Sequence, residues 1–370
     1  MPEWKQPLGI IVNTGNILST RPAIVVGESA VHKSRLNENN GLVVGNDVVV
    51  TPLAAESLGV RSLAVLVKTP DAGVLVDPGV ALGFREHLHP HPLEYQVLAQ
   101  RRTAILEAAR KVDLIVVSHY HHDHFMPFFQ NYALFWSNRR DASALYQQRR
   151  IWCKDIRKNV NWSQQGRGYN FIRSVRRIAK EVAYADGRAL KLGTTLIRFS
   201  PAVPHGELGT PLGWVIMTTI KHNGVTIVHA SDVQGPMVEE TAKWILAQHP
   251  QLLVLAGPPT YLSPERVKPT AISKAAKNLK LLASTIPIIV VDHHLLRDRD
   301  WRNWWNPIQK VAKDNGHQLF TVAEILNESV QILESQRAEL YAKNPPSSDF
   351  NGWVQKIQDS RIKEPPPLHL

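Results

Sequence analysis

Four histidines and an aspartate lie within six residues of one segment, and imidazole and carboxylate groups are the side chains that hold divalent transition metals. The segment is VDLIVVSHYHHDHF, residues 112–125, and the five residues are His119, His121, His122, Asp123 and His124. In an extended loop, His119 and His121 point the same way and can share one metal. Asp123 and His124 lie past the turn and can reach a second metal. This spacing leaves His122 without a role as a ligand.

The segment begins with a strand that would hold these side chains in place. Leu114–Val117 is a short β-branched run bounded by polar residues, which predicts a buried strand. A loop just past the carboxyl end of a strand lies at the rim of a sheet, where a site can be open to solvent and still be held by a rigid scaffold. We therefore expect a metal site at this rim.

Further candidate ligands follow three other predicted strands. They are His205 after Thr194–Phe199, Asp232 after Val225–His229, and the pair His293 and His294 after Pro287–Val291. Because each comes from a different part of the chain, a fold that brings strand ends together would unite them with the first cluster. Asp232 could instead have a structural role as a cap on the helix that follows it.

The combined set suits two metals. The ligands expected for the first metal are His119, His121 and His205. Those expected for the second metal are Asp123, His124 and either His293 or His294, and Asp232 would bridge the two metals. Two cations about 3.5–4 Å apart lower the pKa of a shared water and stabilise a developing oxyanion, so the protein needs no nucleophile of its own.

Three residues are the candidates for catalytic roles. Asp232 would bridge the metals, and Asp123 could orient the water or take up its proton. Of the two adjacent histidines, the one that is not a ligand could hydrogen-bond the substrate, and His294 is our candidate for this role. The sequence does not decide between His293 and His294. We call the loop that carries His119 to His124 the metal loop. Asp77, at the end of a predicted strand, is either a turn cap or a residue that orients the histidines of the metal loop.

Composition narrows the class of protein. The chain has 370 residues, a formal net charge of +11, 44% hydrophobic residues and a single cysteine, Cys153. One cysteine excludes an internal disulfide and a cysteine-rich zinc module. No apolar run is long enough to span a membrane, and the first residues show no secretory signal, so we expect a cytoplasmic protein without a membrane partner. The positive charge is compatible with an anionic substrate or with nucleic acid.

A strongly basic region, residues 130–185, follows the metal loop. Between Arg139 and Lys180 there are twelve lysines and arginines but only two acidic residues, and aromatic residues are interleaved with them. We predict an insert that forms a helical lid over the metal cleft, with residues 164–168 (QQGRG) as a turn. Basic groups beside aromatic rings can also track a nucleic-acid backbone and stack on bases, which keeps nucleic acid open as a partner.

The predicted elements suggest three regions of the chain. Residues 1–41 have no sustained periodicity and are expected to be a loosely ordered extension, and residues 345–370 are expected to be a proline-rich disordered tail. Between them, residues 42–344 alternate strands with helices. This pattern predicts a two-layer sheet core with helices outside it.

The order of the candidate ligands resembles the metallo-β-lactamase superfamily. HxHxDH is followed by a histidine, an aspartate and a further histidine, each at a strand end, and Asp77–Gly79 matches that family's early aspartate–glycine turn except for Pro78. The resemblance implies an α/β fold, a four-layer αββα sandwich of two mixed sheets with helices outside and a two-metal cleft at one edge. More narrowly, residues 52–64 (PLAAESLGVRSLA) and 291–298 (VDHHLLRD) resemble an uncharacterised group of predicted metallo-hydrolases known chiefly from archaea.

The leading functional hypothesis is a hydrolase in which a hydroxide bridging two divalent metals attacks an ester, phosphoester or lactone bond of a small, anionic substrate. Zinc is the expected metal because histidines predominate, although the carboxylates keep manganese and iron open. One alternative is a nuclease that acts on RNA or DNA through the basic region. Another is a non-catalytic metal-containing binding protein. The sequence does not determine the substrate or the oligomeric state.

Overall fold

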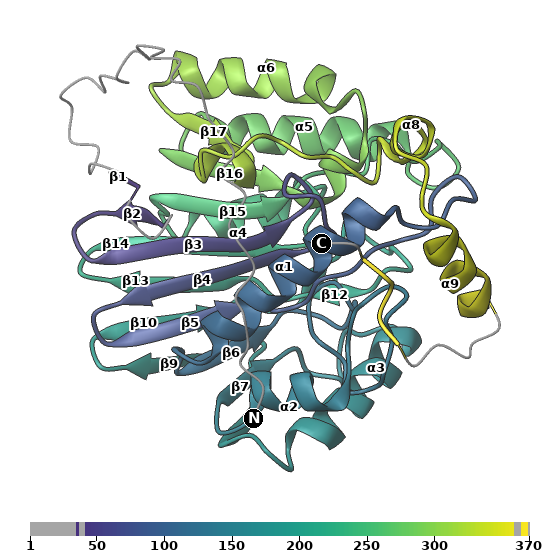
Figure 1. The fold of residues 1–370 in the computed structure, drawn as a ribbon. Helices are drawn as coiled ribbons and strands as arrows, with labels where there is room; N and C mark the ends of the chain where they lie inside the picture. The colour runs from purple at the N-terminus through teal and green to yellow at the C-terminus, as the bar shows by residue number, and fades with distance from the viewer. Residues whose placement is uncertain (1–34, 37–40, 359–363, 369–370) are drawn as a thin grey trace, which may run out of the picture. The chain divides into compact units, whose positions relative to one another are not determined.

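The computed structural model describes residues 35–36, 41–358 and 364–368 (Figure 1). Within these residues the first sheet has eight strands in chain order. They are β1 (Arg35–Leu36), β2 (Leu42–Val44), β3 (Val48–Ala55), β4 (Leu63–Thr69), β5 (Ala72–Val76), β6 (Leu114–Val117), β7 (Arg150–Cys153) and β8 (Glu181–Tyr184). Neighbours are antiparallel from β1 to β5 and parallel from β5 to β8.

The second sheet has seven strands in the order β17-β16-β15-β14-β13-β10-β9. They are β9 (Ala189–Leu192), β10 (Thr195–Phe199), β13 (Thr218–His222), β14 (Val225–Ser231), β15 (Leu252–Ala256), β16 (Ile288–Asp292) and β17 (Gln318–Phe320). The strands from β14 to β17 are parallel and the others are antiparallel. A short pair, β11 (Val203–Pro204) and β12 (Trp214–Val215), forms a separate two-stranded sheet.

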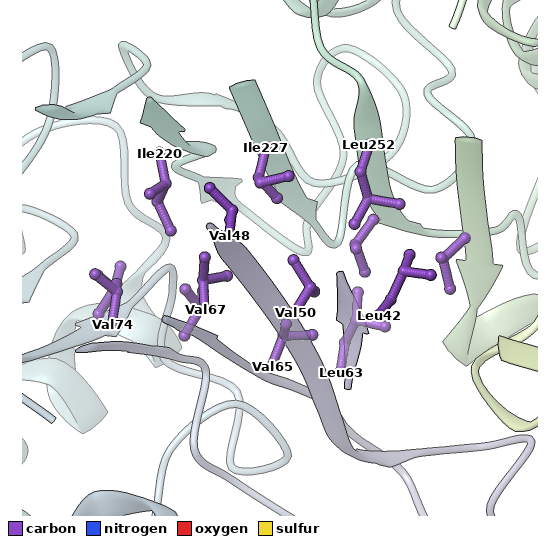
Figure 2. Close-up of a cluster of buried hydrophobic side chains, with 14 of the residues drawn as sticks. Leu42, Val48, Val50, Leu63, Val65, Val67, Val74, Ile220, Ile227 and Leu252 are labelled. Atoms are coloured by element: carbon purple, nitrogen blue, oxygen red, sulfur yellow. The ribbon is translucent and has the colours of Figure 1, made fainter. Parts of the chain in front are cut away.

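The two large sheets pack face to face through branched aliphatic side chains. In β4, Val65 and Val67 belong to the cluster between the sheets, whereas Ala64 and Leu66 belong to the cluster under the helices, as the two-residue period of a strand requires. Figure 2 shows side chains of the first sheet facing Ile220, Ile227 and Leu252 of the second. Both faces of each sheet are therefore buried, which explains the nearly continuous apolar runs in the strands.

Helices cover the outer faces of both sheets. The hydrophobic cluster on the first sheet includes side chains from α1 (Pro92–Ala109), α2 (Arg139–Tyr146), α3 (Trp162–Val175) and α9 (Ser348–Gln358). The cluster on the second sheet includes side chains from α4 (Glu239–Leu246), α5 (Pro269–Ala283) and α6 (Trp301–Asp314). The remaining helical segments are η1 (His293–Arg297), α7 (Val322–Ile325) and α8 (Arg337–Lys343). The predicted α/β fold, a four-layer αββα sandwich of two mixed sheets with helices outside, is confirmed.

The prediction that residues 130–185 form an insert is wrong for two of its segments. Arg150–Cys153 forms β7, which pairs in parallel with β6, and Glu181–Tyr184 forms β8 beside it. Residues 164–168, predicted as a turn, lie inside α3. The region thus continues the first sheet, because β7 pairs with the free edge of β6. Its helices α2 and α3 continue the helical layer over that sheet.

The two termini also differ from the expectation in part. Ser348–Gln358, predicted as disordered, forms α9, whose Phe350 and Trp353 are buried against Tyr95 of α1. Burial of two aromatic side chains stabilises this helix despite the surrounding prolines. At the other end, Arg35–Leu36 pairs with β2, and the rest of the predicted N-terminal extension, except Gly41, lies outside the described residues.

None of the helices within the described residues combines the length and the apolar character that crossing a membrane requires.

Candidate metal centre

The parallel strands of the two sheets carry the candidate site at their carboxyl ends. Asp77 follows β5 and the metal loop follows β6 in the first sheet, while Asp232 follows β14 and His293 follows β16 in the second. Within the metal loop, the backbone N–H of His124 donates to the carbonyl of His121 at 3.0 Å, which closes a tight turn. This turn separates the first two histidines of the motif from its last two ligands.

The predicted ligands lie in four overlapping groups of possible metal ligands. In each group the ligand atoms lie within 4.8 Å of one another. The first group is His119, His121, His205 and Asp232, and the second group is Asp123, His124 and His293. Two further groups share residues with these and are Asp77 with His119 and His124, and Asp232 with His293 and His294. Residues from separate segments of the chain therefore meet at one place.

Asp232 belongs to the first group and to the group with His293 and His294, and its side chain is almost fully buried. Its Oδ2 atom lies 3.0 Å from Nε2 of His205 and 3.3 Å from Nε2 of His124. Its Oδ1 atom lies 3.2 Å from Nε2 of His293. One carboxylate thus faces ligand atoms of both groups, which is the geometry that a bridging ligand requires.

The adjacent residues His293 and His294 occupy different environments. His293 is fully buried, and its Nε2 atom lies 3.3 Å from Nε2 of His124 and 3.6 Å from Oδ2 of Asp123. His294 contacts Asp232 at 3.3 Å, but its side chain is 13% exposed and lines a cleft. His293 therefore belongs to the second ligand group, both histidines belong to a group with Asp232, and His294 alone of the two lines the cleft.

Asp77 supports the metal loop from below. Its Oδ2 atom lies 3.0 Å from Nδ1 of His124 and accepts hydrogen bonds from the hydroxyls of Ser118 and Ser231. Its Oδ1 atom accepts the backbone N–H of Ser118 at 2.8 Å. Of the two interpretations of Asp77, the structure favours the one in which it orients a metal-loop histidine, because carboxylates commonly hold the distal nitrogen of such a ring.

Two acidic residues near the site were missed by the sequence analysis. Glu56, just past β3, contacts Nδ1 of His293 at 2.6 Å and pairs with the guanidinium of Arg297. Asp292 accepts the backbone N–H groups of His293 and of Val322. The signal that could have identified Glu56 is an acidic residue directly after an apolar run, since a buried charge requires a partner.

Burial and charge set the protonation of the histidines. Burial lowers the pKa of His119 and His121 well below 6.5, and lowers that of His294 to about 3. For His293, burial alone would lower the pKa, but the carboxylates of Asp232 and Glu56 outweigh it and raise the pKa to about 9. For His124, Asp232 and Asp77 likewise overcome burial and raise the pKa. Metal binding would displace these protons.

Within the part of the chain that the structure describes, several buried polar atoms of the cluster lack a hydrogen-bond partner. They are Nε2 of His119, Nε2 of His205 and Oδ1 of Asp232. Buried polar groups are nearly always satisfied, so unpartnered atoms that face one another indicate a missing ligand. Nitrogen and carboxylate donors in this arrangement fit divalent transition metals.

An open cavity of about 800 Å³ adjoins the cluster. Its lining includes His294, Gln234, Tyr261 and Arg297. The volume lies within the range of small-molecule sites. His122, in contrast, turns its ring toward Phe129 and Phe135 and belongs to neither ligand group, as its place in the motif predicts.

Comparison with known proteins agrees with this geometry. Residues 58–126 match the family model described as the metallo-beta-lactamase superfamily. A UPF0282 protein of Methanopyrus kandleri is 41% identical over 293 residues, which cover 79% of this chain and 98% of that protein. A UPF0282 protein of Methanocaldococcus jannaschii is 40% identical over 293 residues, covering 79% of this chain and 96% of that protein.

Solved structures are more distant in sequence. The metallo-beta-lactamase fold protein YhfI from Bacillus subtilis is 15% identical, with a TM-score of 0.44 over 75% of this chain and 97% of that chain. On the strength of the sequence relatives and the observed fold, the chain belongs to the UPF0282 family of the metallo-beta-lactamase superfamily.

Proposed function

We propose that this protein is a hydrolase that uses two divalent metal ions to cleave an ester, phosphoester or lactone bond of a small substrate. The observation that supports the proposal is the arrangement around Asp232, which faces ligand atoms of both groups. We assign His119, His121 and His205 to the first metal. We assign Asp123, His124 and His293 to the second metal, with Asp232 between them. Zinc is the expected metal, because histidines make up most of the set.

The metals would supply the nucleophile by lowering the pKa of a shared water. The chain itself would position the substrate and the water. The Asp123 carboxylate is ionised, because neighbouring His124, His293 and Arg297 outweigh the effect of burial and hold its pKa below the ordinary value. As an ionised carboxylate it can hold a metal ion or accept a hydrogen bond that orients a water, whereas its lowered pKa makes it a weak proton acceptor.

His294 has a different role in this proposal. Its ring is neutral at pH 7 and faces the cleft, with Nε2 near Asp232. A neutral imidazole has one donor and one acceptor nitrogen, so with Nε2 donating to Asp232 its Nδ1 can accept a hydrogen bond from a substrate. His294 is thus the candidate for substrate positioning rather than for metal binding.

The test combines metal analysis with a substrate screen. The purified protein should contain close to two metal equivalents and should cleave a member of a phosphodiester, lactone and thioester panel when supplied with Zn, Mn or Fe. His121→Ala should lose metal and Asp123→Ala should lose turnover. His87→Ala, which changes an exposed histidine outside the cluster, should retain both. Less than one metal equivalent, unaffected by His121→Ala, would remove the proposal.

A nuclease is the second candidate, and a specific surface favours it. Helix α3 exposes Trp162 (89%) and Tyr169 (57%), and Arg173 lies over the ring of Tyr169. Aromatic and guanidinium groups together suit single-stranded nucleic acid. Cleavage of a mixed oligonucleotide pool that vanishes in Asp123→Ala would support this candidate. Absence of binding at low salt would exclude it, because phosphate contacts are strongest there. A non-catalytic binding protein would instead keep its metals and cleave nothing.

A further inference from the structure

A second large cavity lies on the outer side of the first sheet, between α2, α3 and the segment 125–129. Its volume is about 720 Å³, which lies within the range of small-molecule sites. We call it the arginine pocket. Arg139 comes from α2, whereas Arg167 and Arg173 come from α3, and Arg177 follows α3. Helices and a loop thus bring four guanidinium groups to one concave surface.

The arginine pocket has no acidic side chain in its lining within the described residues, although Asp123 of the metal loop lies near enough to Arg167 to interact with its charge. In the same part of the chain, no ion pair involves Arg139, Arg173 or Arg177. The nearby carboxylate of Asp141 already forms an ion pair with Arg102 and accepts a hydrogen bond from the side-chain amide of Asn138. Guanidinium groups gathered without carboxylate partners create a positive field that favours a bound anion, and their planar donors match phosphate oxygens.

One wall of the pocket is aromatic. Phe128 and Phe129 line it, and 48% of Phe129 is exposed. Asn170 and Ser174 on α3 add hydrogen-bonding groups. A phosphate alone would use only the guanidinium groups. A ligand with both phosphate groups and a flat heteroaromatic ring would use the phenyl wall and the amide as well.

The pocket is separate from the metal cluster. The two cavities have no lining residue in common, and the residues of the metal groups do not line the arginine pocket. The metal loop contributes His122, whose ring turns away from the ligand groups. Arg167 is held at this end by a hydrogen bond of 3.4 Å from Nη1 to the carbonyl of Tyr120. Binding here would therefore not require the metals.

We propose that the arginine pocket binds a free nucleotide, with its phosphate groups on the arginines and its base against the phenyl rings. This ligand matches the charge, the aromatic wall and the volume of the cavity together. A longer single strand is the alternative occupant that the experiment below distinguishes. The proposal is independent of the hydrolytic function, because it uses different residues.

The experiment is calorimetric titration of the full-length, metal-containing protein with ADP, with pyrophosphate and with a single-stranded hexanucleotide. The pocket variant is Arg139→Gln/Arg177→Gln. The matched control is Arg140→Gln/Arg176→Gln, which removes the same charge from exposed sequence neighbours that do not line the pocket. Because all four arginines are exposed, thermal unfolding should be the same for both double variants.

We expect ADP to bind saturably to the unmodified protein and to the control variant. The pocket variant should bind ADP at least about tenfold more weakly, which is the scale for loss of charge-assisted hydrogen bonds. Phe129→Ala should weaken ADP binding but leave pyrophosphate binding unchanged. His121→Ala should bind ADP normally, because the pocket does not use the metal ligands.

Four results would overturn the proposal. They are no ADP binding at all, equal weakening in both double variants, binding of the hexanucleotide but not of ADP, and loss of ADP binding in His121→Ala. The second result would indicate only a general effect of net charge. The last result would place the nucleotide at the metal cluster.

Discussion

Asp77 and His124 form a fully buried contact of 3.0 Å between Oδ2 and Nδ1, although they come from different strand ends. The contact leaves Nε2 of His124 facing Asp232. A carboxylate behind a histidine fixes the orientation of the ring and raises its basicity as a ligand. The strand that carries Asp77 therefore sets the geometry of the neighbouring metal loop.

Asp77→Asn should weaken metal binding at the second ligand group by about 10- to 100-fold, since it removes the charge behind His124 but keeps the size of the side chain. Competition with a chelator, followed by metal analysis, measures the effect. Asp314→Asn, on the exposed end of α6, should leave metal affinity unchanged. Equal metal retention in both variants would show that the contact is not used for metal binding.

Glu56→Gln should lower the free energy of unfolding by about 3 kcal/mol, because it removes the nearer carboxylate partner of the buried guanidinium of Arg297 and leaves, among the described residues, only Asp123 at 3.6 Å. The double variant Glu56→Gln/Arg297→Gln should recover part of this loss, because the uncompensated charge is gone. Denaturant unfolding of the single and double variants gives the coupling energy. Additive losses would argue against a coupled pair.

The ion pair between Arg61 and Glu334 should make stability dependent on pH. Burial would raise the pKa of Glu334, but Arg61, whose guanidinium donates to it at 2.6 and 2.7 Å, outweighs burial and lowers the pKa from 4.5 to about 2. A lowered folded-state pKa means that the stabilisation is complete above pH 4.5 and is lost as the pH falls toward 2.

Glu334→Gln mimics the protonated carboxyl and isolates this contribution. Compared with the unmodified protein, it should cost up to about 3 kcal/mol of unfolding free energy at pH 7, from 1.4 kcal/mol per pKa unit. The difference should shrink steadily below pH 4.5. Denaturant titrations at a series of pH values measure it, and a difference that stays constant down to pH 3 would contradict the assignment.

Cys153 should be unreactive in the folded protein. It is fully buried in β7, and burial raises the pKa of its thiol to about 12, so almost no thiolate exists at pH 8. Incubation with iodoacetamide followed by mass spectrometry should show modification only after unfolding in guanidinium. Rapid stoichiometric alkylation of the native protein would mean that β7 opens readily.

Trp353→Ala tests whether α9 contributes to stability. The Trp353 ring is 6% exposed and lies edge-on to Tyr95 with 5.3 Å between ring centroids. Its truncation should lower the free energy of unfolding by about 3 kcal/mol. Trp162→Ala removes the same side chain at an exposed position and should change stability by less than about 0.5 kcal/mol. Equal effects of the two substitutions would indicate that α9 is not anchored.

Local sequence patterns were sufficient to predict a strand or helix where its apolar residues follow a regular spacing over neighbouring positions. The strand Leu114–Val117 has the predicted bounds, and the predicted strands Thr194–Phe199 and Pro287–Val291 differ from β10 and β16 by at most one residue at each end. By contrast, β7 and β8 were not predicted, because each has only four residues in a region rich in basic residues. Both strands are stabilised by parallel pairing with a strand that is distant in the chain. Gly168, predicted in a turn, instead lets α3 approach Tyr120 closely, since a Cβ there would lie 2.7 Å from that ring.

By itself, the sequence identified the candidate ligands, because a metal motif requires particular residue types at particular positions after strands. Only the tertiary structure showed that His293 and His294 lie in different environments. His293 adopts a positive φ of 60° as the first residue of η1, and Asp292 holds its N–H while Glu56 holds its ring. The contact with Glu56 joins residues that are 237 positions apart in the chain, so no local pattern records which of two adjacent rings turns inward.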